Sequence, residues 1–196
     1  MSITTNDLLL LETHKQFVSP KTQEQYYKEH GSSEDILQYV RLQGKTFGEK
    51  WCEKLAREYF NLDPRKDSGH DHCKLNKTIE QKSSRYGSNG ADWKWQHIEM
   101  KHHFDYLLLT GLDFNGFNFY ITKRPLVEEL INKNIITGQG KKDTNGIAQP
   151  QQAYWFERKD FKKKGEDFTN YFTLLTNEQS LIDYIQADTS GDSIPS

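Results

Sequence analysis

Long hydrophobic runs and cysteine are both scarce in this sequence of 196 residues. No stretch of about 18 apolar residues is present, which argues against a transmembrane helix. Met1 to Leu11 lacks the basic opening and the small-residue cleavage site of a secretory signal. The two cysteines, Cys52 and Cys73, are too few for a disulfide framework, and their spacing fits no four-ligand zinc motif. We therefore expect a cytoplasmic protein with reduced thiols.

Hydrophobic residues are few as well, at 34% of the chain, and the mean hydropathy is −0.89. Aromatic residues nevertheless make up 13%, so the core must be rich in aromatic rings. The chain is long enough to bury such a core as one domain. No repeat and no Pro- or Ser-rich linker divides it, so we expect a single domain over residues 1–186 and a flexible tail over residues 187–196.

Charge of one sign does not dominate, because 26 Lys and Arg residues face 28 Asp and Glu residues. The net charge of −2 argues against a surface that attracts polyanions everywhere. The charges are unevenly distributed: residues 141–164 carry seven cations and three anions, whereas residues 177–196 carry four anions and no cation. A basic stretch beside an acidic end fits a nucleic-acid ligand on one face, and it also fits ordinary solvated surface.

Hydrophobic periodicity predicts helices first and then strands mixed with helices. In the first 60 residues, Ser19-Pro20 begins a helix that Gly31 ends, Ser33 begins the next, and apolar residues recur every fourth position from Phe47 to Tyr59. The other predicted elements are a hairpin with strands at 70–75 and 78–84, helices at 89–101, 125–133 and 177–185, strands at 104–110, 117–122 and 153–158, and a polar loop at 138–152. This order predicts an α/β fold with a central mixed sheet flanked by helices.

The hairpin within residues 69–84 contains the most informative residues. With Asn76-Lys77 at its tip, equal steps along both strands would place Asp71 opposite Lys82. Because side chains alternate between the two faces of a strand, Asp71, Glu80 and Lys82 would then project from the same face.

Two carboxylates and one ammonium on one face have a chemical use. Carboxylate oxygens from Asp71 and Glu80, with the backbone carbonyl of Gln81, are ligands that suit Mg²⁺. A metal held there would activate a water for attack on a phosphate, and Lys82 would position that water and offset negative charge in the transition state. The alternative is an exposed hairpin on which Lys82 merely forms an ion pair with Asp71.

Asp71, a gap of eight residues and then Glu80-Gln81-Lys82 resemble the signature of the PD-(D/E)XK nucleases, which include type II restriction endonucleases and repair nucleases. The resemblance covers about residues 45–122, with an aromatic-faced helix before the hairpin and the apolar strand at 106–109 after it. His70 stands where the family has proline. The resemblance implies a restriction-endonuclease-like core over residues 45–122, with DNA-reading and dimer elements over 123–186. It implies Mg²⁺-dependent hydrolysis of DNA phosphodiester bonds, with Mn²⁺ as a substitute.

The resemblance also implies supporting residues near the metal. Glu49 and Glu53 lie on the helix from which some family members supply an extra carboxylate, although each also fits a solvated helix face. Gln96 is a candidate for a hydrogen bond to a phosphate or to the attacking water. A zinc site at His70, His72 and Cys73, completed by His97, His102 or His103, is disfavoured because both of the first two histidines would lie opposite Cys73.

Contacts with DNA are expected from basic residues after the active strand and from the polar loop, whose Gln, Asn and Lys side chains suit base edges. The candidates are Arg85, Lys94, Lys101, Gln139, Lys141, Lys142, Asn145, Gln149, Gln151 and Arg158. Double-stranded DNA and a second copy of the chain are the expected partners, since a two-fold dimer matches a palindromic target. The alternatives are a structure-specific or repair nuclease of the same family and a non-catalytic nucleic-acid-binding module.

Overall fold

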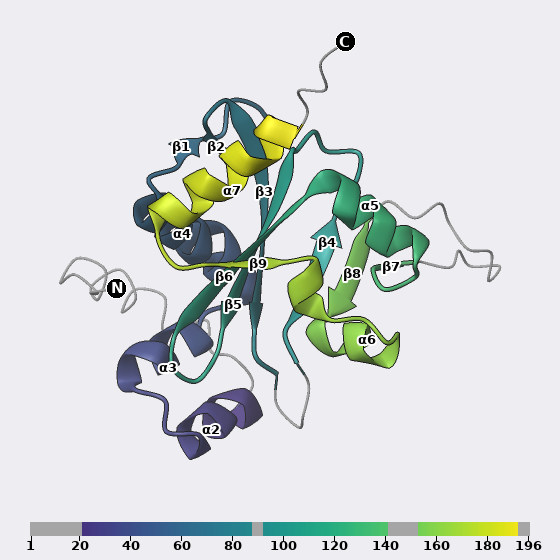
Figure 1. Ribbon diagram of the computed structural model, residues 1–196. Coiled ribbons are helices and arrows are strands. Elements are labelled where there is room, and N and C mark those ends of the chain that lie inside the picture. Colours follow the sequence, from purple (N-terminus) through teal and green to yellow (C-terminus); the bar gives the residue numbers. More distant parts are fainter. Residues whose placement is uncertain (1–20, 88–91, 141–152, 192–196) are drawn as a thin grey trace, which may run out of the picture.

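A computed structural model describes residues 21–87, 92–140 and 153–191, which form a mixed α/β fold (Figure 1). The main sheet has six strands in the order β1-β2-β3-β5-β6-β9, and a smaller sheet has the order β4-β8-β7. The strands are β1 (Asp63–Pro64), β2 (His72–Lys74), β3 (Lys77–Arg85), β4 (Lys94–Ile98), β5 (Tyr106–Leu112), β6 (Phe117–Lys123), β7 (Thr137–Gly138), β8 (Tyr154–Glu157) and β9 (Thr173–Leu175). The helices are α2 (Lys21–Glu29), α3 (Glu34–Val40), the π-helix η1 (Thr46–Cys52), α4 (Glu53–Phe60), α5 (Arg124–Asn132), α6 (Arg158–Lys163), the 3-10 helix η2 (Phe168–Asn170) and α7 (Glu178–Gly191). The predicted class, a mixed sheet flanked by helices, is confirmed at this level.

The helical character predicted for the first part of the chain is confirmed from Lys21 onwards. Gly31 has a φ of 79°, a left-handed conformation that lets the chain reverse between α2 and α3. The side chain of Ser33 caps α3, as its position in the sequence predicts. Phe47 and Trp51 on η1 are buried with residues of α2, α3 and β5. The apolar spacing of this segment therefore marks the face that packs against the rest of the fold.

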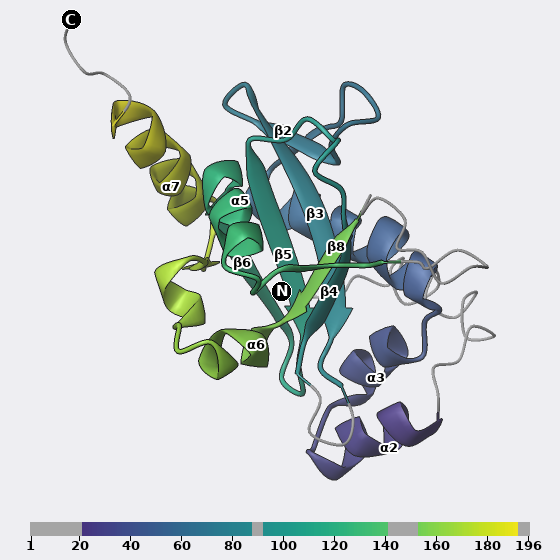
Figure 2. The ribbon, with the colours of Figure 1, turned by 90° about the vertical axis from the view of Figure 1, so that its right-hand side faces the viewer.

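Strand β5 lies inside the main sheet and is buried at every position. Leu107 and Leu109 pack with residues of β4, β8 and α5, and Figure 2 shows β4 and β8 in front of the main sheet. Tyr106 and Leu108 pack with residues of α4 and α7 instead. Burial on both faces explains why this segment is continuously apolar rather than alternating. The strands predicted at 104–110 and 117–122 are confirmed as β5 and β6.

The helix predicted over residues 89–101 is wrong, because Lys94–Ile98 forms β4 of the smaller sheet. Trp95 and Ile98 are its buried residues, and Trp93 is buried just before it. A β-bulge between Trp95 and Ile98, where His97 has a φ of 58°, breaks the alternation expected of a strand. The two-residue period is thus visible only from Trp93 to Trp95, which is too short to indicate a strand.

The hairpin β2-β3 is confirmed, but its register is wrong by two residues. His72 is paired with Ile79 and Lys74 with Lys77, so the turn is Leu75-Asn76 and not Asn76-Lys77. Both turn residues have positive φ, 51° and 61°, as a type I′ turn requires. A slip of two residues leaves the paired residues of β2 and β3 on their predicted faces, whereas a slip of one would have reversed the faces.

The remaining predicted elements near 125–133, 153–158 and 177–185 are confirmed as α5, β8 and α7. Helix α7, however, extends to Gly191, so the tail predicted over residues 187–196 begins as helix, and 192–196 lie outside the described residues. Asp188 fixes this end of α7, since it accepts a hydrogen bond from Tyr106 and pairs with Lys123 at 2.8 Å. Within the described ranges, no helix combines the length and the apolar character needed to cross a membrane.

The close approach of Trp93 to Gly111 predicts an intolerance of side chains at that glycine. A Cβ atom on Gly111 would lie 2.7 Å from Cε2 of the Trp93 ring, inside van der Waals contact in a buried strand. We expect Gly111→Ala to lower the free energy of unfolding by about 1–3 kcal/mol, because the ring must shift within a packed core. Chemical denaturation measures this change.

Gly48→Ala in η1 is the matched control, because a Cβ atom there meets nothing within 4 Å. We expect it to be neutral or to stabilise the protein by up to about 1 kcal/mol, since alanine favours helical backbone. Equal effects of the two substitutions would contradict the packing described for Gly111.

Candidate active site

Strand β3 positions Glu80 and Lys82 on the same face, two residues apart. The Lys82 ammonium donates to Oε1 of Glu80 at 2.6 Å. The Glu80 side chain is only 3% exposed, whereas that of Lys82 is 19% exposed. A buried carboxylate is costly unless it is paired, and here the lysine of the same strand pairs with it.

Asp71 lies one residue before β2 and is held against β3 through the backbone. Its amide donates to the carbonyl of Ile79 at 3.0 Å, and its Oδ2 accepts a hydrogen bond from the Gln81 amide at 2.8 Å. Continued by one step, the observed register places Asp71 opposite Glu80 rather than opposite Lys82. In the described part of the chain Asp71 makes no ion pair with Lys82, so the simple surface pair considered above is not formed.

Gln81 divides its roles between backbone and side chain. Its Nε2 donates to the carbonyl of Cys52 at 3.0 Å and to Oγ1 of Thr110 at 2.7 Å, and its Oε1 lies 2.6 Å from Nε2 of His72. Burial lowers the pKa of His72, so the neutral ring donates this hydrogen bond. The side chain of Gln81 is thus engaged inside the protein, and a metal would have only its backbone carbonyl available.

His102, which the sequence suggested only as a zinc ligand, lies beside Glu80. His102, in the loop between β4 and β5, has Nδ1 3.4 Å from Oε1 of Glu80 and Nε2 3.2 Å from Oε2 of Glu99. The Glu99 carboxylate also pairs with Lys101 at 3.0 Å, and the hydrogen bond from Lys101 is the main cause of its lowered pKa. The sequence signal available was the run of basic residues in a turn before a buried strand.

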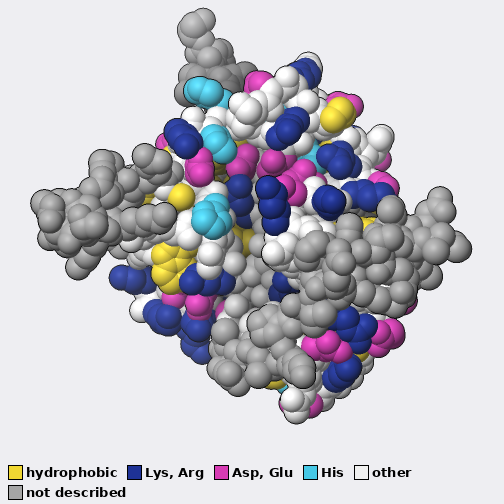
Figure 3. Space-filling model, turned by 180° about the vertical axis from the view of Figure 1, so that it is seen from behind, with side chains coloured by type: hydrophobic (Ala, Val, Ile, Leu, Met, Phe, Trp, Pro, Cys, Tyr) yellow, Lys and Arg dark blue, Asp and Glu magenta, His cyan; other side chains and the backbone are white. Residues whose placement is uncertain are grey.

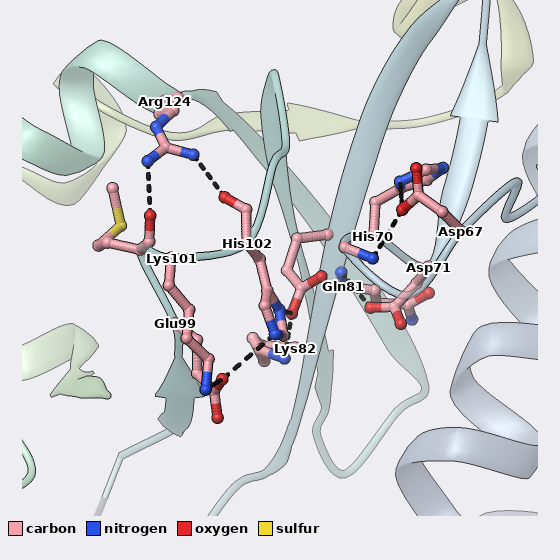
Figure 4. Close-up of polar contacts among 12 residues, drawn as sticks. Asp67, His70, Asp71, Gln81, Lys82, Glu99, Lys101, His102 and Arg124 are labelled. Atoms are coloured by element: carbon pink, nitrogen blue, oxygen red, sulfur yellow. Dashed lines mark hydrogen bonds and ion pairs between the residues drawn. The ribbon is translucent and has the colours of Figure 1, made fainter. Parts of the chain in front are cut away.

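Arg124, at the start of α5, fixes the loop that carries His102. Its guanidinium donates to the carbonyls of His102 and Met100, each at 2.6 Å, and stacks on Phe104 with 4.9 Å from Cζ to the ring centre. Figure 4 shows Arg124 above the loop and His102 beside Lys82, with Asp71 and Gln81 on the other side of the β3 ribbon in this view. In this view, His102 and Lys82 therefore lie on one side of β3, and Asp71 and Gln81 lie on the other.

Of the two supporting glutamates, Glu53 at the start of α4 is under the electrostatic influence of Asp71, whereas Glu49 is an exposed residue of η1. Burial, reinforced by the negative charge of Asp71, raises the pKa of Glu53 to about 7. The repulsion means that α4 brings Glu53 into electrostatic reach of Asp71. Glu49 is 62% exposed and lies 3.8 Å from Lys45 within η1.

His70 does not lie on the face opposite Cys73, as the sequence predicted when a zinc site was considered. Its Nε2 lies 3.2 Å from Sγ of Cys73, because His70 precedes β2 and does not follow the alternation of a strand. Its Nδ1 faces Asp67 at 3.2 Å. Across residues 21–87, 92–140 and 153–191, no three His, Cys, Asp or Glu side chains gather as a ready-made metal site.

Several DNA-binding candidates are engaged within the protein. Arg85 donates to the carbonyls of Tyr39 and Leu42 and stacks on Phe47, and burial lowers its pKa to about 10. Its role is therefore structural, and the predicted phosphate contact does not fit this geometry.

The other candidates are distributed around the smaller sheet. Lys94 lies 4.1 Å from the ring centre of Trp155, Arg158 pairs with Asp92 at 3.1 Å, and Gln139 accepts from the His97 amide. Gln96 lies on β4, not on a helix. Lys141, Lys142, Asn145, Gln149 and Gln151 lie outside the described residues.

One face of the molecule combines all three kinds of charged side chain. Figure 3 shows acidic side chains gathered in the middle of this face, with Lys or Arg side chains next to them and histidines to one side. Side chains of opposite charge therefore lie close together on this face. Comparisons with protein-family models and with curated proteins find no match for this chain. A function for this chain must therefore be inferred from the geometry of the site.

The raised pKa of Glu53 predicts a pH dependence of stability. Between its ordinary pKa of 4.5 and about 7, the folded protein holds a proton that the unfolded chain releases, so this carboxyl lowers stability as the pH rises through that window. We expect Glu53→Gln to raise the free energy of unfolding by about 1–2 kcal/mol more at pH 8 than at pH 4, with an allowance for solvent screening. Chemical denaturation at both pH values measures this difference, with the exposed Glu49→Gln as the control. An equal effect of Glu53→Gln at both pH values would refute the raised pKa of Glu53.

Proposed function

We propose that this protein is a Mg²⁺-dependent DNA endonuclease of the PD-(D/E)XK type, and that it acts as a sequence-specific type II restriction endonuclease in the cytoplasm. The observation that carries the proposal is the buried Glu80 bonded to Lys82 on β3, the strand whose Gln81 amide binds Asp71 at the open end of the hairpin. A carboxylate, a second carboxylate and a lysine in this order and on these strands are what the nuclease signature requires.

The surrounding fold supports the proposal. Strand β3 pairs antiparallel with β2 and parallel with β5, and helix α4 packs on the same sheet. A helix, a hairpin that carries the acidic residues, and a buried parallel strand are the elements expected of a restriction-endonuclease-like core over residues 45–122. The helix predicted over residues 89–101 is replaced by strand β4, so the core departs from the expected pattern there.

The donor set fits Mg²⁺. The metal is commonly held by only one or two carboxylates, with water and substrate phosphate completing its six ligands. Asp71, Glu80 and the backbone carbonyl of Gln81 would hold it, and Glu53 would add charge from α4. The absence of a three-residue cluster in the described ranges does not conflict with such a site, because the missing ligands would be water and phosphate. When bound, Mg²⁺ would lower the pKa of a coordinated water and stabilise charge on the phosphate oxygens.

The side chains of this chain would perform the rest of the reaction. The ammonium of Lys82, released from Glu80, would orient the attacking water and offset the charge that develops on the phosphate. A bond forms between the water oxygen and phosphorus while the bond from phosphorus to the departing sugar oxygen breaks. The water loses its proton to solvent, and the departing oxygen takes one from solvent. A homodimer would present two such sites to the two strands of a palindromic duplex.

Cleavage of a long linear DNA of known sequence tests the proposal. With Mg²⁺ we expect discrete fragments from the wild type, and loss of cleavage by at least about 100-fold in Lys82→Ala and Glu80→Gln, because each removes transition-state charge stabilisation or a metal ligand. Lys77→Ala, which removes a lysine from the same strand, is the matched control and should cut normally.

Three outcomes separate the alternatives. A smear, or cutting confined to branched DNA, would indicate a structure-specific or repair nuclease. Cutting that persists in Lys82→Ala or in the presence of a chelator would place the active site elsewhere. Binding of DNA without cutting, unchanged in Glu80→Gln, would indicate a nucleic-acid-binding module.

Metal binding has a separate readout in protein stability. We expect Mg²⁺ at about ten times its dissociation constant to stabilise the wild type by about 1.4 kcal/mol, because only the folded hairpin presents the carboxylates together. Glu80→Gln and Asp71→Asn should abolish this increment, as measured by thermal unfolding with and without Mg²⁺. An undiminished Mg²⁺ effect in both variants would remove these residues from the metal site.

A further inference from the structure

The loop between β4 and β5 brings an imidazole to the proposed reaction centre that the nuclease signature does not include. His102 lies between two carboxylates, with Nδ1 3.4 Å from Glu80 and Nε2 3.2 Å from Glu99. Its side chain is 28% exposed, whereas that of Glu80 is 3% exposed. The ring therefore forms part of the wall between the buried carboxylate and solvent, on the side from which a phosphate would approach.

The backbone of the loop, and not the imidazole, fixes its position. Arg124 holds the carbonyls of Met100 and His102. At the end of the loop, Asp105 accepts hydrogen bonds from the amide and hydroxyl of Thr78, and its own amide donates to the Thr78 carbonyl and hydroxyl. These contacts survive any substitution of the His102 side chain. Its placement beside Glu80 is thus not needed to anchor the loop.

We propose that His102, with a proton on each ring nitrogen, is a catalytic residue that donates a hydrogen bond from Nδ1 to a nonbridging oxygen of the scissile phosphate, and that Glu99 is the positioning residue that accepts from Nε2 and orients the ring. The inference rests on the proposed nuclease function and adds a substrate contact to it. In the described structure Nδ1 faces an anionic oxygen of Glu80. With a metal held by Glu80, a phosphate oxygen would replace Glu80 as the partner of Nδ1.

Glu99 suits the positioning role because it lies in the same rigid loop. Its Oε2 meets Nε2 of His102 at 3.2 Å and Nζ of Lys101 at 3.0 Å. A carboxylate that binds one ring nitrogen fixes the direction in which the other nitrogen points, as it does in hydrolytic triads. A hydrogen bond aimed at developing charge in a preorganised site contributes about 100-fold or more to a rate.

Single-turnover cleavage at saturating DNA, together with DNA binding measured in Ca²⁺, tests the inference. We expect His102→Ala to slow cleavage by about 100-fold and to change the DNA dissociation constant by less than about 3-fold, because the contact strengthens in the transition state. His102→Asn, whose amide nitrogen replaces Nδ1, should recover about 10-fold of that rate. Glu99→Gln should slow cleavage by about 10-fold.

His103→Ala is the matched control, since it removes an exposed histidine from the same loop and should cleave at the wild-type rate. If the wild type cleaves DNA and His102→Ala cleaves equally fast, this inference alone is overturned. A merely structural role would also overturn it, and would appear as a lowered melting temperature in His102→Ala with no recovery in His102→Asn. A wild type that never cleaves DNA overturns the proposed function and this inference with it.

Discussion

The parallel pairing of β3 with β5 is the constraint on which the rest of the site depends. The two strands stay in register from Ile79 with Tyr106 to Arg85 with Leu112, and β5 is buried throughout. Because β5 is packed on both faces, it cannot shift without disturbing two clusters of buried side chains. Strand β3 inherits this rigidity and carries Glu80, Gln81 and Lys82 to fixed places.

Alternation along β3 then separates structural from chemical roles. Gln81 points its side chain to Cys52 and Thr110, while Glu80 and Lys82 point to the other face and to each other. The side-chain amide of Gln81 is buried, so leaving it without hydrogen bonds would cost free energy. Its hydrogen bonds to Cys52 and Thr110 avoid this cost. The same bonds prevent β3 from sliding, so the buried side chain of Gln81 fixes the positions of Glu80 and Lys82.

The sequence predicted the strand that carries Glu80 and Lys82 better than it predicted the surroundings, for a physical reason. The faces of Glu80 and Lys82 depend only on the parity of the register, and a two-residue error preserves parity, whereas Asp71 precedes β2 and binds the Gln81 amide. Strand β4 was missed because a bulge at His97 interrupts its period. Arg85 was assigned to DNA because a basic residue after an active strand is indistinguishable, in sequence, from one that donates to carbonyls of a packed helical segment. His102 reaches Glu80 only through the fold of a loop, which no local pattern encodes.

Electrostatics gives the site its character. Glu80 is buried between the ammonium of Lys82 and the imidazole of His102, and burial, reinforced by the negative charge of Asp71, raises the pKa of Glu53 to about 7. Each arrangement would be relieved by a divalent cation, since a cation between carboxylates removes their repulsion and frees Lys82 and His102 from Glu80. The same two groups would then face a phosphate, which is the anion that a metal in this position would bring. Without substrate, Lys82 and His102 balance the charge of Glu80. With metal and substrate bound, they would balance the charge of a phosphate instead, as a phosphodiesterase requires.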